Sequence, residues 1–114
     1  MIHKLINQQL LEIAERNKLN YSYSSKCFKL ENGNGKISKM SIMFTTIGNY
    51  VLAIEVDGNK KCLGKVSDVE TLFLLRVLRD KLNENSFPNA LKEMCYSHEK
   101  IQETIKKLKK GVEE

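Results

Sequence analysis

The stretch from Ser67 to Leu82 constrains the fold more than any other part of the chain. Ser67-Asp68-Val69-Glu70 is typical of a capping box, in which the Ser67 hydroxyl accepts a hydrogen bond from the Glu70 N–H and the Glu70 side chain reaches back to the Ser67 N–H. A helix is therefore predicted to start here. Its apolar residues cover more than one face, namely Val69, Leu72, Phe73, Leu74, Leu75, Val77, Leu78 and Leu82. Such a helix has to be buried on two sides, so we expect a sheet against one side and other helices against another.

The size of the chain limits how many cores it can build. With 114 residues, 41% of them hydrophobic, the composition predicts a single domain over residues 1–114. We see no apolar run of about 18 residues, which a membrane span requires, and no signal-peptide pattern at the start, so we expect a soluble cytoplasmic protein.

The three cysteines predict no disulfide framework: Cys27, Cys62 and Cys95 form no C-x-x-C pair. This spacing favours reduced, mostly buried thiols.

Residues before the central helix change from helical to strand periodicity. Apolar positions on one face predict a first helix from about Ile2 to Asn17. Alternation then predicts four strands, the first starting at Tyr21 and kinked near Cys27, followed by residues 37–44, 50–56 and 60–66. In the second strand, Met40, Ile42 and Phe44 form the better core face. Turns are expected at residues 31–35 and 46–49, and Asp57-Gly58 is typical of a type I′ hairpin.

The C-terminal part carries a heptad seam with alternating spacings of three and four: Leu91, Met94, His98, Ile101, Ile105 and Leu108. This seam favours one long helix from about Pro88 to Lys110, with a break at Tyr96-Ser97 as the alternative and Gly111 as the stop. The seam is short for an independent coiled coil, which favours packing within the chain. A homodimer through Leu91, Met94, Ile101, Ile105 and Leu108 stays open.

Together these patterns predict an α+β fold: an antiparallel four-stranded meander with an N-terminal helix, a buried central helix and a long C-terminal helix. From Tyr21 to Leu82, the order of strands followed by the capped helix resembles single-stranded DNA-binding proteins of the whirly kind. That resemblance implies a curved sheet backed by a helix. It lies in element order and in the Ser67–Glu70 helix entry, and it transfers no functional residues.

The sequence offers little catalytic chemistry. Neither His3 nor His98 has a companion at metal-ligand spacing, so we expect no metal and no cofactor. His98, inside the seam, is expected to be a hydrogen-bonded packing residue. The turn Asn32-Gly33-Asn34-Gly35-Lys36 lacks P-loop spacing, and no pair of acidic residues suggests acid–base catalysis. The protein is therefore not expected to be an enzyme.

Charge and aromatic content suggest a binding function. The net charge of +5 suits a negatively charged partner. If the helices cover one sheet face, the other face is expected to present lysines for phosphates and tyrosines for stacked bases. The candidate site consists of Tyr21, Tyr23, Lys26, Lys29, Lys39, Tyr50, Lys60, Lys61 and Lys65.

The leading hypothesis is non-catalytic binding to nucleic acid or a nucleoprotein complex. The alternative is a protein-binding inhibitor or adaptor of phage or mobile-element origin, of the anti-defence type, which occupies the surface of a partner protein. A third reading assigns the lysines only to solvation and edge protection of the sheet.

Overall fold

The computed structural model describes residues 2–24, 27–32, 38–45 and 49–113, and the side chains of these ranges between residues 4 and 109. The chain forms an α+β fold with three helices and an antiparallel sheet. The helices are α1 (Ile2–Asn17), α2 (Asp68–Lys81) and α3 (Phe87–Glu113). The strands are β1 (Asn20–Ser24), β2 (Cys27–Glu31), β3 (Lys39–Phe44), β4 (Asn49–Val56) and β5 (Asn59–Ser67).

The sheet has five strands in the order β1-β2-β3-β4-β5, one more than the sequence predicted. The segment expected to be one kinked strand is a hairpin, in which β1 pairs antiparallel with β2 and Ser24 lies opposite Cys27. The reversal places Tyr21 opposite Leu30 and Tyr23 opposite Phe28. Folding back is favourable because it adds aromatic contacts: the Tyr23 and Phe28 ring centroids lie 4.9 Å apart.

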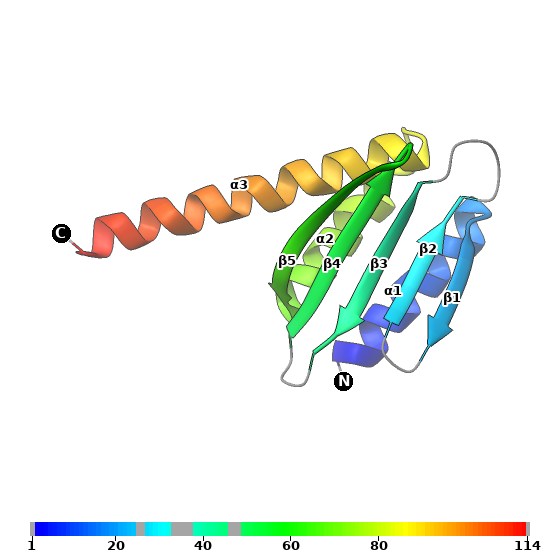
Figure 1. The fold of residues 1–114 in the computed structure, drawn as a ribbon, viewed down its shortest axis with the longest axis horizontal. Helices are drawn as coiled ribbons and strands as arrows, with labels where there is room; N and C mark the ends of the chain where they lie inside the picture. The colour runs from blue at the N-terminus through cyan, green and yellow to red at the C-terminus, as the bar shows by residue number, and fades with distance from the viewer. Residues whose placement is uncertain (1, 25–26, 33–37, 46–48, 114) are drawn as a thin grey trace.

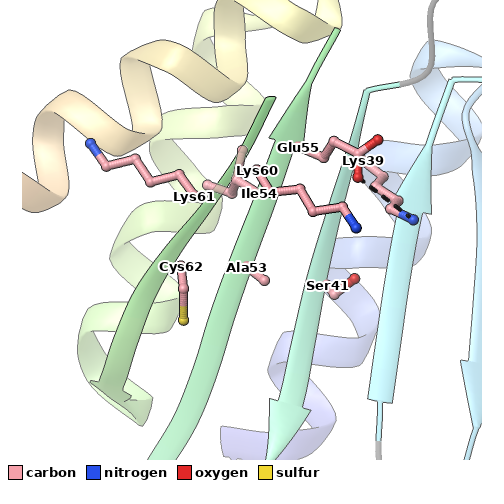
Figure 2. A pocket seen from close by; sticks show the side chains of 8 residues that line it. All are labelled: Lys39, Ser41, Ala53, Ile54, Glu55, Lys60, Lys61 and Cys62. Carbon is pink, nitrogen blue, oxygen red and sulfur yellow. Dashed lines mark ion pairs between the residues drawn. The ribbon is translucent and has the colours of Figure 1, made fainter. Parts of the chain in front are cut away.

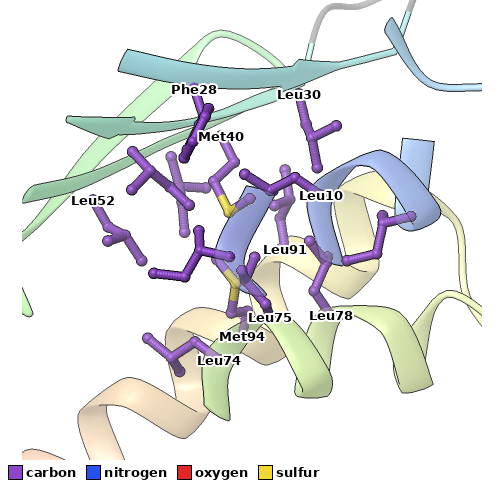
Figure 3. Packing of buried hydrophobic residues seen from close by; sticks show 14 of the residues in the cluster. Leu10, Phe28, Leu30, Met40, Leu52, Leu74, Leu75, Leu78, Leu91 and Met94 are labelled. Atoms are coloured by element: carbon purple, nitrogen blue, oxygen red, sulfur yellow. The ribbon is translucent and has the colours of Figure 1, made fainter. Parts of the chain in front are cut away.

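All three helices lie on one face of the sheet, and the other face is open (Figure 1). Alternate strand residues point toward the helices and form the core with them, including Phe28, Leu30, Met40, Ile42 and Leu52. Helix α2 packs against both α1 and α3, and Figure 3 shows its leucines reaching into this core. Its residues Leu74, Leu75 and Leu78 are fully buried. The prediction of a buried central helix is confirmed for these leucines, but Val69 and Phe73, which the sequence analysis counted with them, are exposed.

Half of the predicted capping box forms. β5 ends at Ser67, whose hydroxyl accepts a hydrogen bond from the Glu70 N–H at 3.2 Å. The reciprocal half is wrong, because the Glu70 carboxylate instead contacts α3. Its two oxygens lie 2.6 Å from His98 Nδ1 and 3.3 Å from Gln102 Nε2. His98 is buried, so its predicted role as a hydrogen-bonded packing residue is confirmed.

Helix α3 is unbroken, which decides between the two alternatives for the C-terminal seam, and it continues through Gly111 instead of stopping there. Leu91 and Met94 are fully buried, whereas Ile105 is 39% and Leu108 64% exposed. The start of α2 lies beside His98 and Gln102. Beyond this contact, none of the helices that the structure describes buries Ile105 or Leu108. This part of α3 projects beyond the sheet (Figure 1).

The turn between β4 and β5 follows the sequence prediction. Asp57 has φ 51° and Gly58 has φ 89°, and a type I′ turn requires positive φ at both central residues. The tight turn brings the first lysines of β5 back over β4.

Candidate nucleic-acid interface

The sheet surface that faces away from the helices is the candidate interface. We call it the open face; its described strand residues are Asn20, Ser22, Ser24, Cys27, Lys29, Glu31, Lys39, Ser41, Met43, Asn49, Val51, Ala53, Glu55, Lys60, Cys62, Lys65 and Ser67. None of these residues is buried. The small residues Ser41 and Ala53 lie side by side on its central strands, with Lys29, Lys39 and Lys60 near them. The larger apolar residues Met43 and Val51 form the next pair along these two strands.

The predicted lysines divide between the two faces of the sheet. Lys29, Lys39, Lys60 and Lys65 lie on the open face, together with the acidic residues Glu31 and Glu55. Lys61 pairs with the core residue Ile54 and points to the helix side, where it forms an ion pair with Glu99 of α3. Lys26 lies outside the described residues.

The predicted tyrosines do not share a face with the lysines. Tyr50 is only 6% exposed and belongs to the core, and Tyr21 donates a hydrogen bond to Asn7 Oδ1 of α1. Burial raises the pKa of both phenols, with smaller contributions from Tyr23 at Tyr21 and from Asp68 at Tyr50. Tyr23 is 57% exposed but lies on the same side, opposite Phe28. Strand register, which the local pattern did not reveal, corrects the expectation of one mixed lysine–tyrosine surface.

A shallow groove of about 320 Å³ runs over the open face near the β4–β5 turn. We call it the sheet groove; it is lined by Lys39, Ser41, Ala53, Ile54, Glu55, Lys60, Lys61 and Cys62. Figure 2 shows Lys60 reaching across β4 toward Lys39, while Lys61 points away toward α3. The Lys39 ammonium lies 4.0 Å from Glu55 Oε1. The groove thus combines small side chains with the ammonium groups of Lys39 and Lys60.

A second groove adjoins the first on the helix side of β5 and contains residues that the sequence analysis missed. Lys60 and Lys61 line both grooves, and α3 contributes Lys92 and Tyr96 to the second. Tyr96 is 54% exposed and Lys100 lies over its ring. Because Lys92, Tyr96 and Lys100 are spaced by four residues, helical periodicity was the available signal for a basic and aromatic stripe.

The cysteines are less buried than expected. Cys62 is exposed on the open face, and Cys27 and Cys95 are partly buried; all three are free thiols.

Within the described residues, no three His, Cys, Asp or Glu side chains gather as metal ligands. The helices that the structure describes include none that is long and apolar enough to cross a bilayer.

Comparisons of the chain with protein-family models, with curated proteins and with solved structures found no match. The likeness of its element order to the whirly kind therefore carries no further argument, and the functional proposal depends on the geometry above.

Proposed function

We propose that this protein is a non-catalytic nucleic-acid-binding protein whose open face contacts the phosphate backbone. One observation carries the proposal: Lys29, Lys39, Lys60 and Lys65 come from three strands of the uncovered face and border the small residues Ser41 and Ala53. Small central residues such as Ser41 and Ala53 allow a backbone to approach the sheet closely. Lysines at the margin then neutralise phosphates and release their counterions.

The acidic residue closest to Lys39 does not prevent such contacts. Glu55 is the near neighbour of Lys39, but the pair lies at the limit of an ion-pair distance and the lysine side chain is substantially exposed. The Glu55 side chain is less exposed, at 16%, but a surface pair at this distance contributes about 0–1 kcal/mol. Exchange of Glu55 for a phosphate as the partner of Lys39 therefore costs little.

Fluorescence anisotropy tests the proposal with a labelled single strand of about 20 nucleotides across a salt series. Lys60→Gln and Lys65→Gln should each weaken binding and lower the log–log salt slope by about 0.7, the value for one phosphate contact of a single strand. Lys4→Gln is the matched control, because Lys4 is an exposed lysine of α1 on the covered side. Absence of saturable binding tighter than about 10⁻⁴ M, the weak end of non-specific affinity, would contradict the proposal.

A second candidate function, binding of a partner protein as an inhibitor or adaptor, is favoured by a different observation. Ile105 and Leu108 on the projecting part of α3 are exposed, and so are Val69 and Phe73 on α2. Val69 adjoins Glu70, which contacts Gln102, one turn before Ile105. The contact between α2 and α3 thus has exposed apolar residues on both helices, a feature typical of protein interaction sites.

Capture of partners from cell extract, with and without nuclease, separates the two functions. A protein retained after nuclease treatment and lost with Ile105→Asp would favour the second function. Nucleic acid retained by both the wild type and this variant would favour the first.

A further inference from the structure

The groove on the helix side of β5 has a composition unlike that of the open face. We call it the β5–α3 groove; it lies between the β4–β5 hairpin and α3 and has a volume of about 530 Å³. This volume falls within the range of about 300–1,000 Å³ typical of small-molecule sites. Its floor is apolar, formed by the buried Ile54 and the partly buried Val56 and Cys95. A flat apolar group can therefore lie against this floor.

Cationic groups and one aromatic ring surround this apolar floor. Lys60, Lys61 and Lys92 line the groove together with the exposed Tyr96 ring. The Lys100 ammonium lies 4.8 Å from the centroid of that ring and adds further positive charge nearby. Three lysines against the single carboxylate of Glu99 give the groove an excess of positive charge. The matching ligand has a flat ring and an attached anion.

The ion pair between Lys61 and Glu99 connects β5 to α3 across the groove. The hydrogen bond between these side chains raises the pKa of Lys61 and lowers the pKa of Glu99, so both are charged at neutral pH. About half of each side chain is exposed, so exchange of Glu99 for another anion costs little. Burial raises the pKa of Cys95, which keeps this thiol protonated and makes it part of the apolar floor, not a nucleophile.

We propose that the β5–α3 groove is a subsite for an unpaired base of a single-stranded nucleic acid, with the base against Tyr96 and an adjacent phosphate at Lys61 and Lys92. The proposal rests on the proposed function, because the same strand also contacts the open face. Lys60 and Lys61 line both grooves, so a backbone that follows the lysines passes around the start of β5 from one groove to the other. A duplex does not fit this path, since its bases are paired and stacked.

The test measures binding of a 20-nucleotide single strand and of a blunt duplex to the full chain. Tyr96→Ala should weaken single-strand binding by about 5- to 150-fold, the loss expected for one stacked base, with no change in salt slope or in duplex binding. Tyr96→Phe should bind as the wild type does, because the ring is kept. Lys92→Gln should lower the salt slope by about 0.7.

Tyr23→Ala is the matched control, since Tyr23 and Tyr96 are similarly exposed but Tyr23 lies on β1, at the opposite edge of the sheet. Far-UV circular dichroism and thermal unfolding check that each variant folds. A single-stranded oligonucleotide that contains the fluorescent base 2-aminopurine gives a direct readout. Stacking of this base on the ring at position 96 should quench the 2-aminopurine fluorescence in the wild type and in Tyr96→Phe, and not in Tyr96→Ala.

The two proposals fail in different ways. If Tyr96→Ala and Lys92→Gln bind the single strand as the wild type does while Lys60→Gln and Lys65→Gln bind it more weakly, the subsite is overturned and the proposed function stands. If the wild type binds neither probe, both are overturned.

Discussion

A β-bulge at Gly64 decides whether Lys65 of β5 lies on the open face. Lys60 and Cys62 point to this face, so in an unbroken strand the next even-numbered residues would join them and Lys65 would point toward the helices. A shift of register between Leu52 and Ala53 pairs Gly64 with Leu52 and Lys65 with Val51. This β-bulge turns Lys65 outward and leaves Val66 in the core.

The bulge depends on a backbone conformation that glycine adopts easily. Gly64 has φ +77°, and an added Cβ would meet no atom within 4 Å, so a substitution acts through conformation and not through a clash. We expect Gly64→Ala to lower the free energy of unfolding by about 1–2 kcal/mol, and Gly64→Asn by less, because Asn visits this region more readily. Urea denaturation measures the difference. Ser22→Ala is the control, because Ser22 is exposed on β1, at the other edge of the sheet from the bulge. An equal stability of Gly64→Ala and wild type would contradict the account.

Burial of the Tyr50 phenol should make the protein less stable at alkaline pH. Burial, with a smaller contribution from Asp68, raises the pKa of this phenol above its ordinary value of 10.0. The protonated form is therefore favoured in the folded state, and its contribution to stability is complete below pH 10 and is lost as pH rises through the folded-state pKa. Tyr50→Phe should reduce the loss of unfolding free energy between about pH 9 and 12, although Tyr21 keeps a part of it.

Chemical denaturation at several pH values provides the measurement, with the exposed Tyr96→Phe as the control. An alkaline loss in Tyr50→Phe as large as that of the wild type would show that this phenol is not the cause.

Helix α2 joins the other two helices and the sheet, so its buried leucines should dominate stability. Leu75→Ala should cost about 2–5 kcal/mol, because it removes a fully buried side chain and leaves a cavity. Val69→Ala on the same helix should cost less than about 0.5 kcal/mol, since Val69 is 67% exposed. Urea denaturation of both variants tests this contrast. Similar costs for the two changes would mean that α2 is not packed as described.

The long axis of the molecule comes from α3, which extends the fold to 51 × 28 × 23 Å. Its seam changes character along its length: Met94 is fully buried, whereas Ile105 and Leu108 are exposed. Within the isolated chain, only the first part of the seam contributes to the core. The residues left for the homodimer that the sequence allowed are therefore Ile105 and Leu108, with Ile101 partly buried.

Alanine variants along this seam should therefore differ in how much unfolding free energy they lose. Met94→Ala should cost about 2–5 kcal/mol, and Ile105→Ala less than about 0.5 kcal/mol, the range for surface positions. Chemical denaturation at two protein concentrations, together with light scattering, measures both effects. A destabilisation by Ile105→Ala that grows with protein concentration would contradict the exposed state of this residue in solution and indicate that a second copy covers it.

Local interactions explain what the sequence alone determined about this protein. The start of α2 at the Ser67 cap, the hairpin at Asp57-Gly58 and the long α3 each follow from residues within about four positions of one another. The alternation in β3 also predicted Met40 and Ile42 as core residues, because one face of the strand is buried.

Contacts between distant residues decided the rest. The pairing of β1 with β2 turned Tyr21 and Tyr23 to the helix side, and the β4–β5 register placed Lys65 on the open face. The Glu70 carboxylate, predicted to bind the Ser67 N–H, instead lies against His98, 28 residues away in the sequence. The β5–α3 groove brings together Lys61 and Tyr96 in the same way. A local pattern carries no information on such pairings, because their free energy comes from burial and hydrogen bonds that exist only after the chain has folded.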